Sequence, residues 1–477
     1  MPLLLTIVSS LLLMQGHAAA NVWEKPGNSA AVRPPNVVFI MADDLGYSDL
    51  GATGSGYYET PHIDRLAAHS MQLTRYYHCQ NCQPTRAAIF SGQYGTRTGV
   101  FTVGSVNRFA WWKRSLRPPE NVTQLPLDRT TIAQVLQQAG YVTGMFGKWH
   151  LGEEGQYHPR HRGFDEAITS SGKHFNFTTN PQTDVPPGAY LADFLTDRAV
   201  DFIHRHRSKP FFLYLPHFGV HSPHEAKPEL IAKFAARPPV GGHKNATYAA
   251  MIASVDESVG RVLDVLDELD LAENTVVIFT SDNGGVGGYA REGLGPNGDV
   301  TDNAPLRSGK GSLYEGGTRV PFFVRWPGQT QPGAKCDVPA THVDLFPTLV
   351  ELTGSQLPQQ TLDGESLLSL FRDPAANLKR DAIFAHHPSY LGQGEGKFRT
   401  TPASSIICGD WKLIEFFEDS RLELYNLRED VGEMHNSVNS HPDLAKQLHA
   451  RLVAWRQSTG AQLPTPHTPG IKPRDLN

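Results

Sequence analysis

Cysteine is scarce in this chain: four of its 477 residues are cysteine, which excludes a small fold held together by several disulfides. Beyond the N-terminus no run of ~18 apolar residues occurs, so no membrane-spanning helix is expected there. The sequence also has no long run of Lys and Arg, and its net charge is −5. Both features argue against a nucleic acid or an acidic membrane surface as a partner.

The first twenty residues are the exception to this lack of apolar runs. They are apolar from Leu3 to Met14 and end in three alanines at 18–20. This pattern predicts a signal peptide at residues 1–20, cleaved near Ala20, although no Lys or Arg precedes the apolar run. The alternative is a buried N-terminal helix. The run is also too short to span a membrane. We therefore expect a secreted or periplasmic protein.

Apolar strands alternate with amphipathic helices over most of the chain. Strands are expected at residues 36–41, 141–146, 210–215, 275–280 and 320–324. The alternation predicts an α/β domain over 34–372, with a large, mainly parallel sheet and helices on both faces. Residues 373–377 resemble a domain boundary. Short antiparallel strands and one helix then predict a smaller C-terminal α+β subdomain over 378–460, followed by an irregular tail over 461–477.

Carboxylates follow two of these expected strands at the point where each strand ends. Asp43 and Asp44 come after the first strand, and Asp282 with Asn283 after the fourth. Open α/β sheets bind their ligands at the carboxyl ends of strands. Oxygen ligands of this kind suit Ca²⁺ or Mg²⁺ rather than zinc or copper. Either pair alone could be a helix cap or a turn, but two pairs at strand ends favour a metal site.

Basic and titratable side chains form a second set of candidates. Lys148 and His150 alternate just after a strand, so both can face one pocket, where they would suit an anionic substrate and proton transfer. In isolation they would be typical of a solvated loop. Lys310 stands between two glycines, which either bring it close to a ligand or leave it flexible on the surface.

Three histidines, His217, His221 and His224, share the segment after the strand at 210–215. Their spacing would suit zinc, but the prolines around them predict a loop and not a metal-binding helix. A general acid or a substrate contact is the better interpretation, with His221 the best placed.

Residues 82–86 (CQPTR) combine a cysteine, a proline and an arginine at a predicted helix start. Pro84 suits a first helical turn, and a helix from about Pro84 would direct its free N–H groups and positive dipole end at Cys82. Arg86 adds a permanent positive charge. An oxyanion, or a nucleophile that carries negative charge, would be stabilised there.

Cys79 and Cys82 have CxxC spacing, which allows other interpretations. The spacing would fit a thioredoxin-like redox pair or half of a zinc site. No second CxxC exists to complete a zinc site, and a redox motif has little use for the Pro-x-Arg that follows. A disulfide between the two cysteines after export stays open.

Together these segments resemble the type I, formylglycine-dependent sulfatases of the alkaline-phosphatase-like superfamily, from Asn36 to about Trp455. The most specific part of the resemblance is Cys82-x-Pro84-x-Arg86. Residues 140–152 (GYVTGMFGKWHLG) are similar to a second family signature. Thr85 stands where the family often has Ser. The remaining candidates, in the family's order, are Asp43-Asp44, Asp282-Asn283 and Gly309-Lys310.

The resemblance implies an arylsulfatase-like enzyme, a sulfuric ester hydrolase whose nucleophile is made by modification. Cys82 would be oxidised to formylglycine by a formylglycine-generating enzyme or an anaerobic maturase. One hydroxyl of the formylglycine hydrate would then attack sulfur. The implied cofactor is one divalent cation, Ca²⁺ or alternatively Mg²⁺. Its implied ligands are Asp43, Asp44, the modified Cys82, Asp282 and Asn283.

The resemblance also implies roles for the other candidates. Arg86 would support the charge on the nucleophile, and Lys148 and Lys310 would bind sulfate oxygens. His221, with Lys310 as a candidate partner, would protonate the departing alcohol. His150 would take the proton of the second hydroxyl, so that sulfate leaves and the aldehyde is restored.

The predicted substrate is a sulfated saccharide or another sulfate ester. The loops at 96–126, 153–189 and 285–307 are expected to select it, and Trp111 and Trp112 would either stack on a sugar or anchor their loop. One alternative is a phosphatase or phosphodiesterase of the same superfamily. Such an enzyme would want a second metal and more His and Asp ligands, which the sequence does not show. The other alternative is an unconverted protein that binds sulfated glycan without catalysis.

Overall fold

The computed structural model describes residues 33–294, 299–394 and 397–472. The predicted signal peptide at 1–20 lies outside these residues. The main element is an eight-stranded sheet that is parallel except where β10 pairs antiparallel with β2 and β8. Its strands, in spatial order, are β11 (Lys335–Cys336), β2 (Met71–Leu73), β10 (Phe322–Arg325), β8 (Thr275–Ser281), β1 (Asn36–Ala42), β7 (Phe211–Pro216), β5 (Val142–Gly147) and β6 (Glu166–Thr169).

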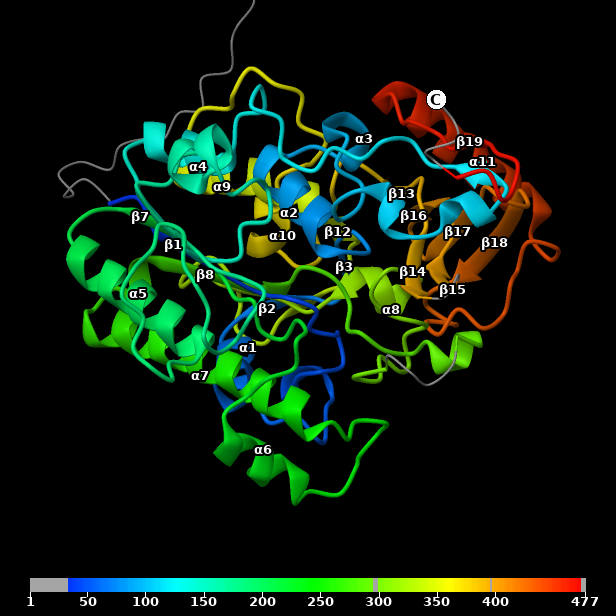
Figure 1. Cartoon of the computed structure of the whole chain (residues 1–477). Helices are drawn as coiled ribbons and strands as arrows, with labels where there is room; N and C mark the ends of the chain where they lie inside the picture. Colours follow the sequence, from blue (N-terminus) through cyan, green and yellow to red (C-terminus); the bar gives the residue numbers. More distant parts are fainter. Residues whose placement is uncertain (1–32, 295–298, 395–396, 473–477) are drawn as a thin grey trace, which may run out of the picture. The chain divides into compact units, whose positions relative to one another are not determined.

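Helices cover both faces of this sheet, as predicted (Figure 1). One face packs against α1 (Pro61–Ala68), α5 (Leu191–His206), α6 (Pro228–Ala235) and α7 (Ala246–Glu268). The other packs against α2 (Cys82–Ser91), α4 (Ile132–Gln138), α9 (Leu345–Thr353) and α10 (Leu368–Arg372). Every residue of β1 is buried because both of its faces are covered, which explains its continuous apolar sequence. No helix in the described ranges is long and apolar enough to cross a membrane.

The strand expected at 320–324 is two strands. Pro321 interrupts it, so β9 (Arg319–Val320) joins a small sheet with β3 (Tyr76–Tyr77) and β12 (Ala340–Thr341), while β10 continues in the main sheet. Proline has no N–H to donate to a neighbouring strand, and a change of sheet at that position avoids the lost hydrogen bond. β3 precedes Cys82 and β9 follows Lys310, so the pairing of these two strands connects the segments that carry the two residues.

The C-terminal part is an antiparallel sheet with one long helix, as predicted. Its strands are β13 (Ala382–His387), β16 (Ala403–Cys408), β17 (Trp411–Phe416) and β18 (Arg421–Asn426), and α11 (Pro442–Thr459) packs on them. The predicted boundary at 373–377 falls between α10 and β13. A further hairpin joins β14 (Leu391–Gly394) and β15 (Lys397–Thr400). The tail is not wholly irregular, since β19 (Thr465–Pro466) pairs with β4 (Leu116–Arg117).

A buried ion cluster ties the C-terminal sheet to the segment that follows Lys310. Lys412 on β17 lies 3.0 Å from Glu315, the first residue of α8 (Glu315–Thr318), and 2.9 Å from Glu433. Glu433 also accepts the N–H of Glu315 at 2.7 Å. The C-terminal sheet is therefore held against the segment that follows Lys310.

Candidate active site

The carboxylates predicted to bind metal come together at the carboxyl ends of β1 and β8. These strands are parallel neighbours, and Ala42 pairs with Ser281 at the last position before the acidic residues. The N–H of Asp44 donates to Oδ1 of Asp282 at 3.2 Å, and Nδ2 of Asn283 donates to Oδ1 of Asp44 at 2.9 Å. The chain turns sharply here, since Asp44 has a φ of 65°. The strand register thus gathers these oxygens in one cluster.

Buried cations accompany these carboxylates. Arg86 donates to Oδ2 of Asp282 from Nη2 at 2.7 Å and from Nε at 3.1 Å, and its Nη2 lies 3.5 Å from Oδ2 of Asp43. Lys148 also pairs with Oδ2 of Asp43. All of these side chains are buried, and ionised groups are stable in such a place only when opposite charges face them.

Lys310 completes the set by pairing with Asp44. Its Nζ lies 2.7 Å from Oδ2 of Asp44, and Nε2 of His221 lies 3.7 Å from the same oxygen. Burial would raise the pKa of Asp44, but the charges of Lys310 and His221 outweigh it and hold the pKa well below its usual range. The pKa of Asp282 is raised to about 6, because burial and the charge of Asp43 favour the protonated form.

Cys82 is the first residue of α2, so this helix begins two residues earlier than the start predicted at Pro84. Pro84 is the third helical residue, where its missing N–H is still not needed by the helix. The Thr85 hydroxyl donates to the carbonyl of Asn81 at 3.1 Å and accepts the N–H of Cys79 at 3.0 Å. These two bonds fix the path of the chain just before Cys82.

The Cys82 thiol is buried, which favours its protonated form. Burial raises its pKa, although the charges of Lys148 and Lys310 oppose this effect. A protonated thiol is a poor nucleophile, so the residue as encoded is not ready to react. Cys79 is directed elsewhere: its Sγ lies 3.6 Å from Nε2 of His342, and both cysteines of the CxxC are free.

The cluster has the properties of a site for a hard divalent cation. Ligand atoms of Asp43, Cys82 and Asp282 all lie within 4.8 Å of one another. Two buried oxygens, Oδ1 of Asp43 and Oδ1 of Asn283, have no hydrogen-bond partner among the described residues. A buried oxygen without a donor is unfavourable unless it binds something else. Carboxylate and amide oxygens of this kind fit Ca²⁺ or Mg²⁺.

A cavity of about 610 Å³ lies beside this cluster. Cys82 lines it together with the predicted residues Lys148, His150, His221 and Lys310. Lys148 and Lys310 contact both the cavity and the buried carboxylates, because they pair with Asp43 and Asp44. The cavity therefore presents positive charge, which suits an anionic substrate.

His150 and His221 contribute different ring nitrogens. His221 Nδ1 donates to the carbonyl of Ser222 at 2.6 Å, which leaves Nε2 on the side of Asp44. Burial lowers the pKa of His221 to about 3. Burial and the charge of Lys148 lower the pKa of His150 well below its usual range, and its buried Nδ1 has no partner in the part of the chain that the structure describes. His150 is therefore neutral, with a ring nitrogen able to accept a proton.

The other two histidines of the 217–224 segment do not line this cavity. His217 is fully buried, and its Nε2 lies 2.9 Å from Oγ of Ser258 in the core between β7 and α7. His224 packs edge-on against the ring of Tyr248. Of these three histidines, His221 alone is among the residues that line the cavity.

The loops expected to select the substrate contribute unequally. The loop at 96–126 supplies Val103, Arg108 and Phe109 to the cavity, and the loop at 153–189 supplies Ser171 and Gly172. Of the described residues in 285–307, none lines it. Trp111 is buried and donates from Nε1 to Asn107 at 2.8 Å, so it anchors its loop.

Two contributors to the site were not predicted from the sequence. Gln83 donates to the carbonyls of Thr123 and His150 at 2.6 and 3.1 Å and accepts the N–H of Gly104 at 3.1 Å, which joins two points of the loop at 96–126 to the segment after β5. The hairpin of β14 and β15, here called the C-terminal hairpin, supplies Leu391, Gly392 and Arg399 to the cavity. A glutamine inside the CQPTR segment was the only sequence signal for the first, and nothing in the sequence pointed to the second.

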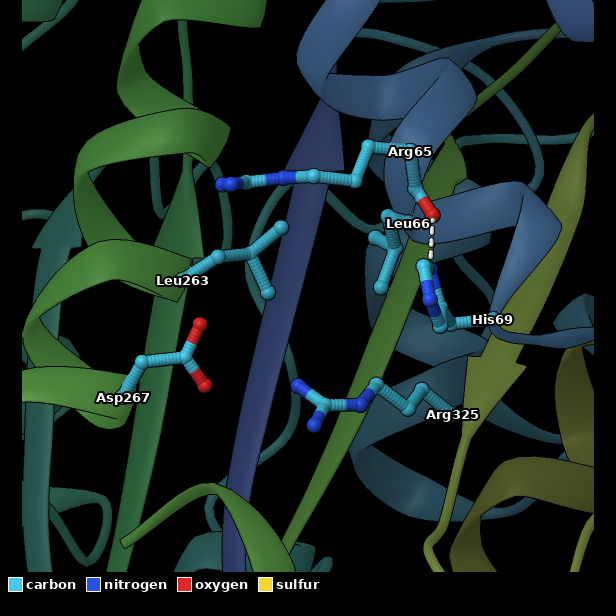
Figure 2. Close-up of a pocket in the computed structure, with 6 residues that line it drawn as sticks. All are labelled: Arg65, Leu66, His69, Leu263, Asp267 and Arg325. Carbon is cyan, nitrogen blue, oxygen red and sulfur yellow. Dashed lines mark hydrogen bonds between the residues drawn. The ribbon is translucent and has the colours of Figure 1, made fainter. Parts of the chain in front are cut away.

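A second, smaller cavity lies near the start of β8, at the end of the main sheet opposite the candidate metal ligands (Figure 2). Its volume is about 100 Å³, and Arg65, Asp267 and Arg325 surround it. Arg65 is already paired with Asp264 at 2.7 Å, and its carbonyl bonds the ring of His69 at 2.8 Å. None of the predicted site residues lines this cavity.

The chain is similar to known proteins over most of its length. Residues 35–355 match the family described as Sulfatase, and residues 309–458 match N-sulphoglucosamine sulphohydrolase, C-terminal. A protein of Formosa agariphila named sulfatase is 34% identical over 93% of this chain and 92% of its own length. N-acetylgalactosamine-6-sulfatase of Homo sapiens is 33% identical over 78% of this chain and 73% of its own length.

A solved structure shows the same similarity. Ps i-CgsB in complex with k-i-k-neocarrahexaose superposes on this chain with a TM-score of 0.76 and 28% sequence identity. The superposition covers 90% of this chain and 95% of that chain.

Proposed function

Because the chain belongs to the sulfatase family of the alkaline-phosphatase-like superfamily and is a sulfuric ester hydrolase, we propose that it cleaves the sulfate ester of a carbohydrate through a formylglycine hydrate made from Cys82. One observation carries this proposal. Cys82 begins a buried helix and lines a cationic cavity beside two buried oxygens that lack hydrogen-bond partners among the described residues, and burial raises the pKa of its thiol. The position suits a nucleophile, and the thiol does not.

The proposed cofactor is one divalent cation, with Ca²⁺ preferred over Mg²⁺ because carboxylate and amide oxygens in an irregular cluster suit the more flexible coordination of calcium. The cation would supply positive charge that lowers the pKa of the attacking hydroxyl. Two unsatisfied oxygens, on Asp43 and Asn283, support this part of the proposal. The proposed ligands are Asp43, Asp44, the modified Cys82, Asp282 and Asn283.

The remaining residues would bind the sulfate and move protons. Lys148 and Lys310 line the cavity next to Cys82, where they would hold sulfate oxygens and stabilise the charge that develops on them. Arg86 is placed behind them and would support the negative charge of the nucleophile. The two lysines in the cavity and the arginine behind them would make the site complementary to a sulfate in transfer.

Proton transfer would use the two histidines that line the cavity. His221 Nε2 carries no proton in the neutral ring whose Nδ1 donates to Ser222, so it would pass a proton from Lys310 beside it to the oxygen of the departing alcohol as the S–O bond to that oxygen breaks. His150 would then accept the proton of the second hydroxyl, so that the C–O bond to sulfate breaks and the aldehyde forms again. The neutral state of His150 supports its role as the base.

The proposed substrate class is a sulfated carbohydrate. Two relatives support it by their names: N-acetylgalactosamine-6-sulfatase, and Ps i-CgsB, which was solved with k-i-k-neocarrahexaose. A cavity of about 610 Å³ has room for a saccharide unit as well as its sulfate. A phosphatase that shares the superfamily is the competing function.

Export and domain organisation are part of the same proposal. Cleavage near Ala20 would release a mature chain with a catalytic domain over 34–372 and a C-terminal subdomain over 378–460. N-terminal sequencing of the protein recovered outside the cytoplasm of its host would test the cleavage site. A protein retained inside with an intact N-terminus would contradict it.

Mass spectrometry of the Cys82 peptide from the native host tests the chemistry directly. Formylglycine is lighter than cysteine, and an unmodified thiol throughout the sample would refute the proposed nucleophile and favour the unconverted glycan-binding protein. Release of sulfate from a panel of sulfated mono- and oligosaccharides, with phosphate esters of the same sugars beside them, tests the reaction. Preferential release of phosphate would favour the phosphatase. Cys82→Ala should abolish turnover and leave the circular dichroism spectrum unchanged.

A further inference from the structure

Among the described residues that line the main cavity, four carry a permanent positive charge and none is Asp or Glu. Two of these cations, Lys148 and Lys310, are paired with the carboxylates behind them. The other two, Arg108 and Arg399, form no ion pair with a carboxylate of the described residues. They come from distant parts of the chain, one from the loop at 96–126 and the other from β15. These two arginines are not accounted for by the proposed chemistry at Cys82.

Arg399 is held against the Lys310 segment by close packing. A Cβ added to Gly311 would lie 2.3 Å from Leu391 and 3.3 Å from Cδ of Arg399, so the missing side chain of Gly311 makes room for the C-terminal hairpin. Gly311 also has a φ of +95°, which other residues rarely adopt. The stem of Arg399 is thereby fixed one residue away from the lysine proposed to bind sulfate.

The guanidinium of Arg399 is positioned by stacking and not by an acidic partner. Its Cζ lies 4.3 Å from the centre of the Tyr289 ring, and the Tyr289 hydroxyl donates to the carbonyl of Lys310 at 2.7 Å. Its Nε is buried and has no hydrogen-bond partner among the described residues. A charged donor buried without a partner is costly, and a bound anion would satisfy it.

Arg108 is the exposed counterpart on the other loop. Its Nη1 donates to the carbonyl of Val103 at 2.9 Å, and its Cζ lies 5.6 Å from the centre of the Phe109 ring. The loop that carries it is joined to α2 through the bond from the Gly104 N–H to Gln83. Arg108 is therefore tethered to the same helix that begins with Cys82, with guanidinium nitrogens left over for a ligand.

We propose that Arg399 and Arg108 recognise a second anionic group on the saccharide, either a sulfate or a carboxylate, in addition to the ester that is hydrolysed. A single sulfate ester brings one negative charge, and Lys148 and Lys310 already face it. Guanidinium groups offer planar pairs of donors that match the oxygens of sulfate and carboxylate. The preferred substrate is thus a polyanionic saccharide. This inference rests on the proposed function, because it describes what the same cavity selects.

Kinetics with three matched saccharides test the inference. One carries a single sulfate ester, the second carries an additional sulfate and the third carries an additional carboxylate. In Arg399→Gln and Arg108→Gln, the preference for a doubly charged saccharide, taken as its kcat/KM divided by that of the singly charged one, should fall about 10-fold, mainly through KM. Arg399→Lys should retain part of the preference, because charge and stem remain.

Arg372→Gln is the matched control, since it removes the same charge from an exposed position of α10 outside the cavity. If Arg399→Gln and Arg108→Gln change the preference no more than Arg372→Gln does, the inference is wrong. A loss confined to the saccharide with the additional sulfate would identify sulfate as the second group, and a loss confined to the other would identify a carboxylate.

A binding measurement separates this inference from the proposed function. Calorimetry on Cys82→Ala protein gives the Kd of each saccharide without turnover. Tighter binding of a doubly charged saccharide, weakened about 10-fold by adding Arg399→Gln, would support the inference even if no sulfate is released in the kinetic assay. Equal Kd values for singly and doubly charged saccharides would overturn it, while sulfate release by the unmutated enzyme would still support the proposed function.

Discussion

Arg86 and Asp282 form a fully buried ion pair in which Nη2 and Nε of the arginine both donate to Oδ2 of the carboxylate, at 2.7 and 3.1 Å. The other oxygen of Asp282 accepts the N–H of Asp44. One arginine at the start of α2 thus orients the loop after β1 as well as the loop after β8. The pair links the helix that begins with Cys82 to the carboxylates proposed to bind metal.

Breaking this pair should destabilise the fold far more than breaking an exposed pair of the same geometry. Arg86→Met leaves the Asp282 carboxylate without its main partner in a buried place, which should lower the free energy of unfolding by about 3–5 kcal/mol. Arg65→Met is the control, because Arg65 also lies 2.7 Å from an aspartate, Asp264, but both side chains are about half exposed. Its loss should be about 0–1 kcal/mol. Equal losses in urea unfolding would contradict the interpretation.

Calcium should stabilise the protein through the oxygen cluster. A ligand that binds only the folded state at 100 times its Kd adds about 2.7 kcal/mol, so adding Ca²⁺ should raise the Tm and a chelator should reverse the rise. Asp43→Asn should weaken this response, because one oxygen that lacks a hydrogen-bond partner in the described structure belongs to Asp43. Asp264→Asn, on an exposed face, should keep it. An unchanged calcium response in Asp43→Asn would exclude Asp43 as a ligand.

Strand ends were the part of the site that could be predicted from sequence. Asp43 and Asp282 each follow an uninterrupted apolar run, and parallel neighbours bring such positions together without further information. Gln83 could not be predicted, because its role depends on backbone groups of the loop at 96–126 and of His150, which are far from it in sequence. Arg399 could not be predicted either, since its place in the cavity follows from how the C-terminal hairpin packs on Gly311.

Gln83 should prove important for activity although it has no chemical role in the proposed mechanism. Gln83→Glu places a carboxylate oxygen where an amide N–H now donates to the carbonyls of Thr123 and His150. The lost bonds and the buried charge should lower the unfolding free energy by about 1–3 kcal/mol and reduce kcat by displacing the His150 segment. Gln83→Met, which is similar in volume and uncharged, should be milder. A variant Gln83→Glu with the kcat of the unmutated enzyme would show that this bridge does not position the site.

The buried cluster of Lys412, Glu315 and Glu433 should make stability depend on pH. Burial raises the pKa of Glu433 from its ordinary 4.5 to about 7, with Lys412 opposing and Glu315 adding to the shift. Between pH 4.5 and about 7 the folded protein keeps a proton that the unfolded chain has lost. The contribution of this group to stability is therefore fully present below pH 4.5 and is lost as the pH rises through about 7.

Glu433→Gln, which cannot ionise, should flatten this part of the pH dependence. The measurement is the free energy of unfolding in urea at several pH values, compared between the variant and the unmutated protein. Glu429→Gln, at an exposed position nearby, is the control and should leave the slope unchanged. A slope that persists in Glu433→Gln would assign the pH dependence to other groups.

Cys82→Ser distinguishes the proposed formylglycine hydrate from an ordinary hydroxyl nucleophile. The proposed mechanism releases sulfate by re-forming an aldehyde, which requires two oxygens on one carbon, and a serine side chain has only one. The Cys82→Ser variant should therefore accept sulfate once and remain sulfated, visible by mass spectrometry as one added sulfate group on that peptide. Cys82→Ala should gain no mass. Sustained turnover by Cys82→Ser would mean that water can hydrolyse a plain sulfate ester in this cavity. The modified cysteine would then not be required for turnover.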